Sequence, residues 1–176
     1  MNKFPPNCSL RRATPADLAA YAELARRTFT ETYREAHDAV SLARHVAATL
    51  SDERVRAELE DEGRTVLAVT VGPEWVGYTV LATGATPPEV PGNQPLEIAR
   101  FYVESAWHGR GVAAPLMDAV LAEARRQGGD AAWLCVWEHN ARALRFYLGR
   151  GFELIGRTTY IFDGQPEDDH LLAIRL

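Results

Sequence analysis

The sequence has few cysteines, no long apolar run and no basic cluster, and each shortage excludes a class of protein. Its two cysteines, Cys8 and Cys135, show neither metal-ligand spacing nor the framework of a disulfide-rich domain. No apolar stretch reaches the ~18 residues that a membrane-spanning helix needs. The stretch Met1–Leu10 lacks the continuous apolar region of a signal peptide. These features predict a cytoplasmic protein that makes no membrane contact.

The charge balance is acidic, which argues against nucleic acid as a partner. The 176 residues carry a net charge of −5, and no basic patch stands out. Apolar residues make up 47% and charged residues 24%, as is typical of a soluble globular protein. This length suits one domain with a real core, so we predict a single domain over residues 1–176.

Capping residues and apolar periodicity predict an alternation of helices and strands. Thr14, Pro15 and Asp17 form a helix start, because they suit the cap and the first turn. Residues 84–95 hold four prolines and two glycines and are predicted to be a loop. Strands are expected at 9–12, 65–71, 75–82, 96–103, 131–136, 152–162 and 171–175, and helices at 14–29, 40–50, 51–59, 112–127 and 141–150. This order predicts an α/β or α+β fold with a mixed sheet, in which 65–71 and 75–82 form an antiparallel hairpin.

The stretch H-G-R-G-V-A-A, residues 108–114, lies between a predicted strand and a predicted helix. Its two glycines let consecutive backbone N–H groups converge, and a helix N-terminus adds partial positive charge. The segment can therefore be a site for a phosphate group or a plain turn. The G-K-[ST] of a Walker A loop and the third glycine of a Rossmann fingerprint are both absent.

This segment resembles the acetyl-CoA site of the GCN5-related N-acetyltransferases, whose motif is Gln/Arg-x-x-Gly-x-Gly/Ala. His108 departs from that pattern, and Ala113 is an allowed last residue. A second block, V-W-E-H-N-A-R-A-L-R-F-Y-L-G-R-G-F, is similar to the family's Asn-x-x-Ala-x-x-x-Tyr-x-x-x-Gly-Phe and supplies Asn140, Ala143, Tyr147, Gly151 and Phe152. The segments F-T-E-T-Y, L-E-I-A-R-F-Y-V and T-T-Y-I-F-D-G-Q look like the bacterial spermidine/spermine N-acetyltransferases.

The resemblance implies a fold and a cosubstrate. The fold would be a mostly antiparallel mixed sheet of six or seven strands, flanked by helices, with strands 96–103 and 131–136 splayed apart around acetyl-CoA. Backbone groups of 101–103 would pair with the pantetheine arm, and the N–H groups of 110–114 would hold the pyrophosphate. The expected cofactor-binding residues are Phe101, Tyr102, Val103, His108, Gly109, Arg110, Gly111, Val112, Ala113, Ala114, Asn140 and Tyr147.

The implied reaction is attack of an amine on a thioester, and it needs a proton acceptor. Alkylamines are mostly protonated at neutral pH, since their pKa is about 10.4. Glu97 matches the catalytic glutamate of the histone-acetylating branch, although it could instead face solvent or pair with a basic neighbour. Glu138, His139 or a water molecule are the next candidates for the proton acceptor, and His108 comes after them. Tyr147 would protonate the CoA thiolate, or it is simply a core tyrosine; Asn140 would cap its helix and could touch pantetheine.

Direct transfer requires neither a metal nor an acyl-enzyme. Cys135 has no readable His–Asp partnership, so we expect a small buried residue rather than a nucleophile. Substrate contacts are expected from Phe29, Tyr33, Glu97 and Glu138, because aromatic rings and carboxylates suit a cation. The remaining acidic residues could join them or be solvated surface charges: Glu31, Glu35 and Asp38 near the first helices, and Asp163, Glu167, Asp168 and Asp169 in the last hairpin loop.

The sequence therefore favours an acetyl-CoA-dependent N-acetyltransferase acting on a small amine, with a polyamine suggested by the resemblance. An enzyme acetylating a protein N-terminus or lysine is the alternative within the family. An acyl-CoA-binding regulator without turnover is the alternative of another class. The final strands could pair across a two-fold axis, so a homodimer is also considered.

Overall fold

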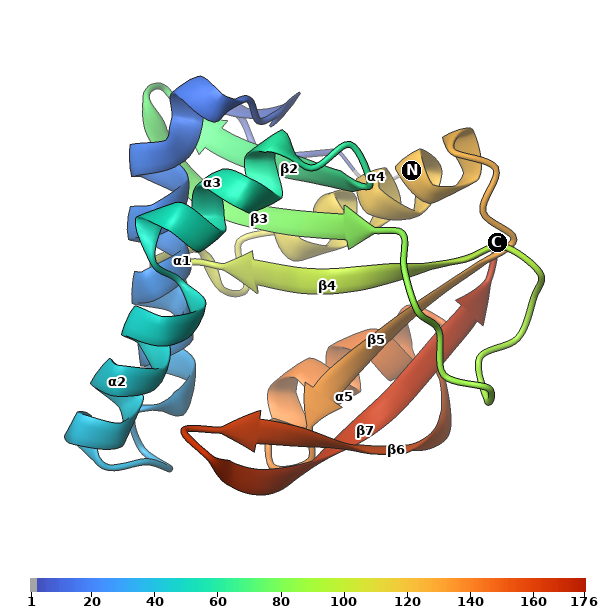
Figure 1. Cartoon of the computed structure of the whole chain (residues 1–176). Coiled ribbons are helices and arrows are strands. Elements are labelled where there is room, and N and C mark those ends of the chain that lie inside the picture. The colour runs from blue at the N-terminus through green and yellow to red at the C-terminus, as the bar shows by residue number, and fades with distance from the viewer. Residues whose placement is uncertain (1–2) are drawn as a thin grey trace. The chain divides into compact units, whose positions relative to one another are not determined.

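A computed structural model describes residues 3–176, and its elements follow the predicted order (Figure 1). A 3-10 turn at Pro15–Asp17 precedes α1, and a second one at Ser105–Trp107 precedes α4. The strands and helices are β1 (Cys8–Arg12), α1 (Leu18–Tyr33), α2 (Ala39–Thr49), α3 (Asp52–Glu60), β2 (Arg64–Val71), β3 (Glu74–Ala82), β4 (Pro95–Val103), α4 (Ala113–Arg126), β5 (Ala131–Trp137), α5 (Ala141–Gly149), β6 (Glu153–Phe162) and β7 (Gln165–Arg175).

The last strand differs from its prediction, which began it at residue 171. It begins at Gln165, and a tight turn at Asp163 and Gly164 joins it to β6. Both turn residues have positive φ, 47° and 82°. The predicted hairpin loop was therefore too long, and Glu167, Asp168 and Asp169 lie in β7.

The chain forms a seven-stranded mixed sheet in the order β1-β2-β3-β4-β5-β7-β6, and it divides into two compact units. The first unit runs to Val80 and includes Arg100–Val120; the second comprises Leu81–Ala99 and Leu121–Leu176. The single-domain assignment stays a prediction.

In the first unit, β1 pairs antiparallel with β2, and Gly72-Pro73 connects β2 to β3 so tightly that these two strands run antiparallel, as predicted. Helix α3 is tied to β4 by a charged group below the surface. The Arg100 guanidinium contacts the Glu58 carboxylate at 2.9 Å, and the Tyr21 hydroxyl donates to the same carboxylate. Such pairing satisfies charges that would be costly to bury alone.

In the second unit, β4 and β5 run parallel, and the ladder joins the first three residues of each strand, from Pro95↔Ala131 to Glu97↔Trp133. On the other side, β5 pairs antiparallel with β7 over its whole length, and β7 pairs with β6. The parallel pair β4–β5 within a mixed seven-stranded sheet confirms the predicted fold class.

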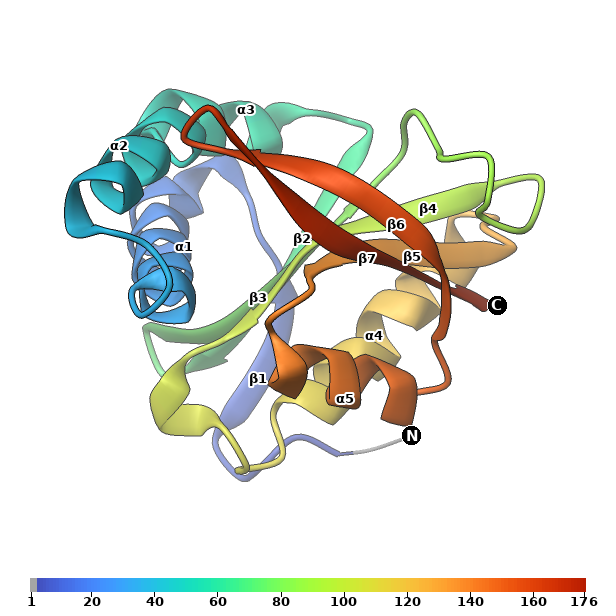
Figure 2. The ribbon, with the colours of Figure 1, turned by 90° about the horizontal axis from the view of Figure 1, so that it is seen from below.

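The register of the second unit sorts side chains onto two faces, because alternate residues of a strand point to opposite sides. Trp133, Cys135 and Trp137 lie on one face of β5, opposite Ala173, Leu171 and Asp169 of β7. Helix α5 lies along β5 and β7 (Figures 1 and 2). A Cβ at Gly151, just after α5, would lie 3.5 Å from Ile174, which places this helix on the opposite face.

Candidate functional site

The glycine-rich segment forms a bend that ends in free backbone donors. Gly109 and Gly111 have φ of 72° and 80°, a conformation that glycine adopts without strain. Helix α4 begins at Ala113, and its first hydrogen bond runs from the Leu116 N–H to the Val112 carbonyl. The N–H groups of Gly111 to Ala114 have no acceptor among residues 3–176. This is the geometry of a phosphate-binding helix N-terminus.

The row of donors is one residue shorter than predicted. The Arg110 N–H donates to the Trp107 carbonyl at 3.3 Å, so the row begins at Gly111. The Arg110 guanidinium lies 5.8 Å from the centre of the Trp107 ring, at the distance of a cation–π contact.

His108, which departs from the family motif, closes the bend. Its Nε2 lies 2.8 Å from the Val103 carbonyl oxygen, so the ring donates to the end of β4. Glutamine and arginine, the family's usual residues here, also carry N–H donors. One lone pair of the Val103 carbonyl is thereby used inside the loop.

Asn140 caps the start of α5, and Tyr147 lies in its last turn. The Asn140 side-chain oxygen accepts from the Ala143 N–H at 3.1 Å, which confirms the predicted cap. Tyr147 is buried, and its ring meets those of Phe146 and Phe152 edge-on at 5.6 and 5.8 Å. This packing fixes the direction in which the phenol group points.

Glu97 and Cys135 lie on one face of the second unit. Glu97 is half-buried and stands in register with Trp133, two residues before Cys135. Cys135 is exposed, contrary to the prediction of a buried residue. Desolvation, followed by the charges of Asp169 and Glu97, raises the pKa of its thiol to about 12. A thiol that stays protonated at neutral pH is a poor nucleophile, which agrees with the expectation that Cys135 is not one.

Asp169 is one of the three carboxylates that the predicted loop wrongly included. It lies in β7 opposite Trp137 and is only 9% exposed. Burial, reinforced by Glu167, Asp168 and Glu138, raises its pKa to about 6. The alternation of Glu167, Asp169, Leu171 and Ala173 could have indicated a strand that continues inward from the turn.

Glu138, a predicted substrate contact and a reserve base, is paired. Its carboxylate lies 3.2 Å from the Arg157 guanidinium and 3.7 Å from the His139 ring. Its own N–H donates to the Asp168 carbonyl, which fixes the exit of β5 against β7.

The predicted contacts on the first helices fall into packed and exposed groups. Phe29 is 5% exposed and stacks on His45 at 5.5 Å, so it serves the packing of α1 on α2. Tyr33 is half-buried, with its ring 4.5 Å from that of Phe29. Asp38 caps α2 by accepting from the Val40 and Ser41 N–H groups, which is a structural use of that carboxylate. Glu35 is exposed and Glu31 half-buried.

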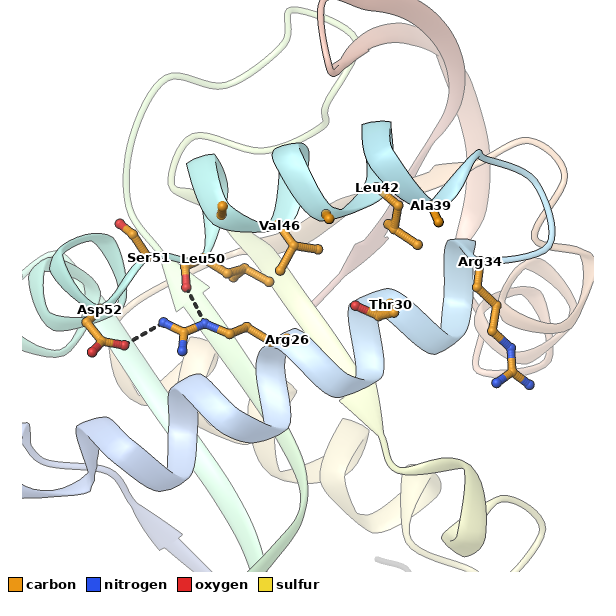
Figure 3. A pocket seen from close by; sticks show the side chains of 11 residues that line it. Arg26, Thr30, Arg34, Ala39, Leu42, Val46, Leu50, Ser51 and Asp52 are labelled. Carbon is orange, nitrogen blue, oxygen red and sulfur yellow. Dashed lines mark hydrogen bonds and ion pairs between the residues drawn. The ribbon is translucent and has the colours of Figure 1, made fainter.

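A groove of about 750 Å³ lies between α1 and α2 (Figure 3). Leu42, Val46 and Leu50 form its apolar wall, and Arg26 crosses its floor to the Leu50 carbonyl and the Asp52 carboxylate. The Arg26 guanidinium is therefore already neutralised. Arg34 lines the far end of the groove (Figure 3).

The described residues form neither a metal-binding cluster nor a membrane-spanning helix. Within residues 3–176, no group of three or more His, Cys, Asp or Glu side chains could hold a metal ion. In the same range, no helix is both long and apolar enough to cross a membrane.

Comparison with known proteins connects this geometry to a family. Residues 18–152 match the model of the acetyltransferase (GNAT) family. An uncharacterized N-acetyltransferase of Mycobacterium tuberculosis is 32% identical over 160 residues, which cover 91% of this chain and 98% of the relative. Streptothricin acetyltransferase of Streptomyces lavendulae is 31% identical over 128 residues, or 72% and 65% of the two chains.

A solved structure shares the fold. The PaiA N-acetyltransferase of Thermoplasma acidophilum, in complex with coenzyme A, superposes with a TM-score of 0.74 at 16% identity, over 96% of this chain and 99% of the other. The chain belongs to the GNAT acetyltransferase family and is an acetyl-CoA-dependent N-acetyltransferase.

Proposed function

We propose that the chain transfers the acetyl group of acetyl-CoA directly to a primary amine of a small molecule. The observation that carries the cosubstrate site is the set of four N–H groups from Gly111 to Ala114 that lack acceptors among the described residues. A pyrophosphate would supply acceptors to several of these donors at once, and the α4 N-terminus would favour its charge.

The other cosubstrate contacts follow from the resemblance. The pantetheine arm carries amides that would pair with backbone groups of Phe101, Tyr102 and Val103, as an added strand does. Asn140 would hydrogen-bond the same arm through the part of its amide that the cap leaves available. The side chain of His108 would act indirectly, by holding the bend through Val103.

The reaction exchanges one bond for another. The neutral amine attacks the thioester carbonyl, the C–N bond forms, and the C–S bond breaks to release the CoA thiolate. Tyr147 would give that thiolate a proton and recover one from the new amide nitrogen or from solvent. Glu97 would take the proton that the substrate ammonium must lose before it can attack.

A small-molecule acceptor is favoured by one relative. Streptothricin acetyltransferase is, by its name, an enzyme for a small molecule, and it aligns with 72% of this chain. The names of the similar proteins above include no polyamine, so polyamines enter only through the sequence resemblance and form one arm of the test.

An amine panel with acetyl-CoA tests this proposal. Spermidine, spermine, an aminoglycoside, streptothricin and peptides with a free N-terminus or lysine are each incubated with enzyme. Thiol release is followed and products are identified by mass spectrometry. We expect at least one small amine to gain a single acetyl group.

Two outcomes would replace the proposal. Acetylation of peptides alone would make the chain a protein acetyltransferase. Binding of acetyl-CoA in isothermal titration, without transfer to any member of the panel, would favour a non-catalytic acyl-CoA-binding protein.

A further inference from the structure

Asp169 is a mostly buried residue whose carboxylate meets no partner among residues 3–176. The residue is 9% exposed, no hydrogen bond or ion pair to its side chain is found within the described part of the chain, and its oxygens are not among the fully buried side-chain atoms there. Buried carboxylates are normally paired or hydrogen-bonded, because an isolated one loses its hydration without compensation. Such an exception needs a reason, and one reason is a charged ligand.

The surroundings of Asp169 indicate what charge its ligand would carry. Asp169 stands in register with Trp137, and Glu97 stands in register with Trp133, from the two strands that flank β5. Both carboxylates therefore lie on the same face of the sheet as Cys135 and diagonally to it, and Asp169 is about 7–8 Å from it by the usual spacing of antiparallel strands. Cys135 is exposed, so this face is open to solvent at that point.

The charged groups around Asp169 are almost all acidic. Glu167 and Asp168 come from its own strand, and Glu138 comes from the end of β5. On β6, Thr158 faces Asp169, Tyr160 faces Glu167, and Arg157 is committed to Glu138. Glu89, from the loop before β4, lies next to Gly156 of β6. The position thus favours a cation, and the aromatic ring of Trp137 beside it suits an ammonium group.

We propose that Asp169 receives the ammonium group of the substrate and takes its proton, with Glu97 adding negative charge from the other side of Cys135. This inference rests on the proposed function and moves the role of base from Glu97 to Asp169. One ammonium proton goes to the Asp169 carboxylate and then to solvent. A second proton, lost as the amide forms, ends on the CoA thiolate, so that charges and atoms balance.

Burial suits Asp169 to this role. A carboxylate with a pKa of about 6 is a stronger base than an ordinary aspartate and is still largely ionised at neutral pH. Asp169 also has a short side chain and stands on β7, between β5 and β6. Its carboxylate is therefore held in place more firmly than that of a loop residue. Thr158 and Trp137 flank it from the neighbouring strands.

Kinetics of Asp169→Asn, with Asp168→Asn as the matched control, test the inference. Asp168 carries the same charge on the adjacent residue, but it is exposed and points to the other face, opposite Thr159. With the best amine of the panel, kcat/KM of the wild type should fall below a pH of about 6. Asp169→Asn should lose at least ~100-fold in kcat/KM and the acidic limb with it. Asp168→Asn should lose less than ~10-fold and keep the limb, moved to slightly lower pH because one of the charges that raise the pKa of Asp169 is gone. A wild-type profile in Asp169→Asn, or an equal loss in both variants, overturns the inference.

A measurement on the wild-type chain keeps the test independent of the variant's folding. Carbon-13 NMR of labelled aspartate carboxyl groups should show one that titrates at a pH of about 6, and its titration should shift to lower pH when the panel's best amine is added. No shift at saturating amine also overturns the inference. If the wild type neither binds acetyl-CoA nor acetylates any amine, the proposed function is wrong. If Asp169→Asn keeps the wild-type turnover rate, only this inference is wrong.

Discussion

A buried carboxylate without a partner destabilises a folded chain whenever it is ionised. The folded-state pKa of Asp169 is about 6, above its ordinary value of 3.8. Between these values the folded chain binds more protons than the unfolded chain, so stability falls as pH rises through about 6. At neutral pH the ionised Asp169 carboxylate therefore lowers the free energy of unfolding.

Asp169→Asn should consequently raise the free energy of unfolding at a pH of about 8, by ~1–2 kcal/mol after allowance for solvent screening. At a pH of about 4, where the wild-type group is mostly protonated, the two proteins should be close to equal. Urea unfolding at both pH values measures this. A destabilised variant at the higher pH would mean that Asp169 has a favourable partner.

Tyr147 should matter to chemistry more than to binding. Its hydroxyl is the only part that Tyr147→Phe removes, and the ring packing against Phe152 stays. We expect kcat to fall by about 10-fold or more, with acetyl-CoA affinity changed by less than about threefold. Steady-state kinetics and isothermal titration give the two numbers, and equal losses in both would reassign Tyr147 to cosubstrate binding.

Single residues were predictable from the sequence where their role is local. The Asn140 cap follows from its place before a helical pattern and is confirmed. The His108 contact with Val103 could not be predicted, because it depends on how far the bend returns toward the strand. The surroundings of Asp169 depend on the pairing of β7 with β6 and with the more distant β5, so they required the register.

At the scale of elements, the bend before α4 is held by backbone conformation. Gly111 has φ of 80°, a region that side chains with a Cβ rarely adopt, although space is open around it. Gly111→Val should therefore reorient the donors and lower acetyl-CoA affinity by at least ~10-fold through strain rather than a clash.

Ala113→Gly is the control for that change. Ala113 opens α4 with helical geometry, so glycine there keeps the N–H group and costs only the ~1 kcal/mol of helix propensity. Isothermal titration with acetyl-CoA compares the two variants. Similar affinities for Gly111→Val and wild type would show that this bend does not hold the cosubstrate.

Element boundaries were predictable where turn residues mark them. Ser51 and Asp38 accept from backbone N–H groups at the starts of α3 and α2, near the predicted helix starts. The start of β7 was missed because Glu167, Asp168 and Asp169 look like a polar loop. In the structure one of these carboxylates turns inward and another outward, as the period of a strand requires.

At the scale of the whole molecule, the order of helices and strands and the two family motifs sufficed to predict the fold class and the cosubstrate. The substrate was not predictable in the same way, because one fold can serve different amines and the fold class does not distinguish them. The predicted homodimer stays a prediction, with β6 as the edge strand that a second chain could meet.

Amine-dependent thiol release at saturating acetyl-CoA tests the central claim most directly. The account predicts that the best amine of the panel raises the rate at least ~10-fold above the rate with acetyl-CoA alone, with one acetylated amine formed per thiol. Equal rates with and without every amine of the panel would contradict it.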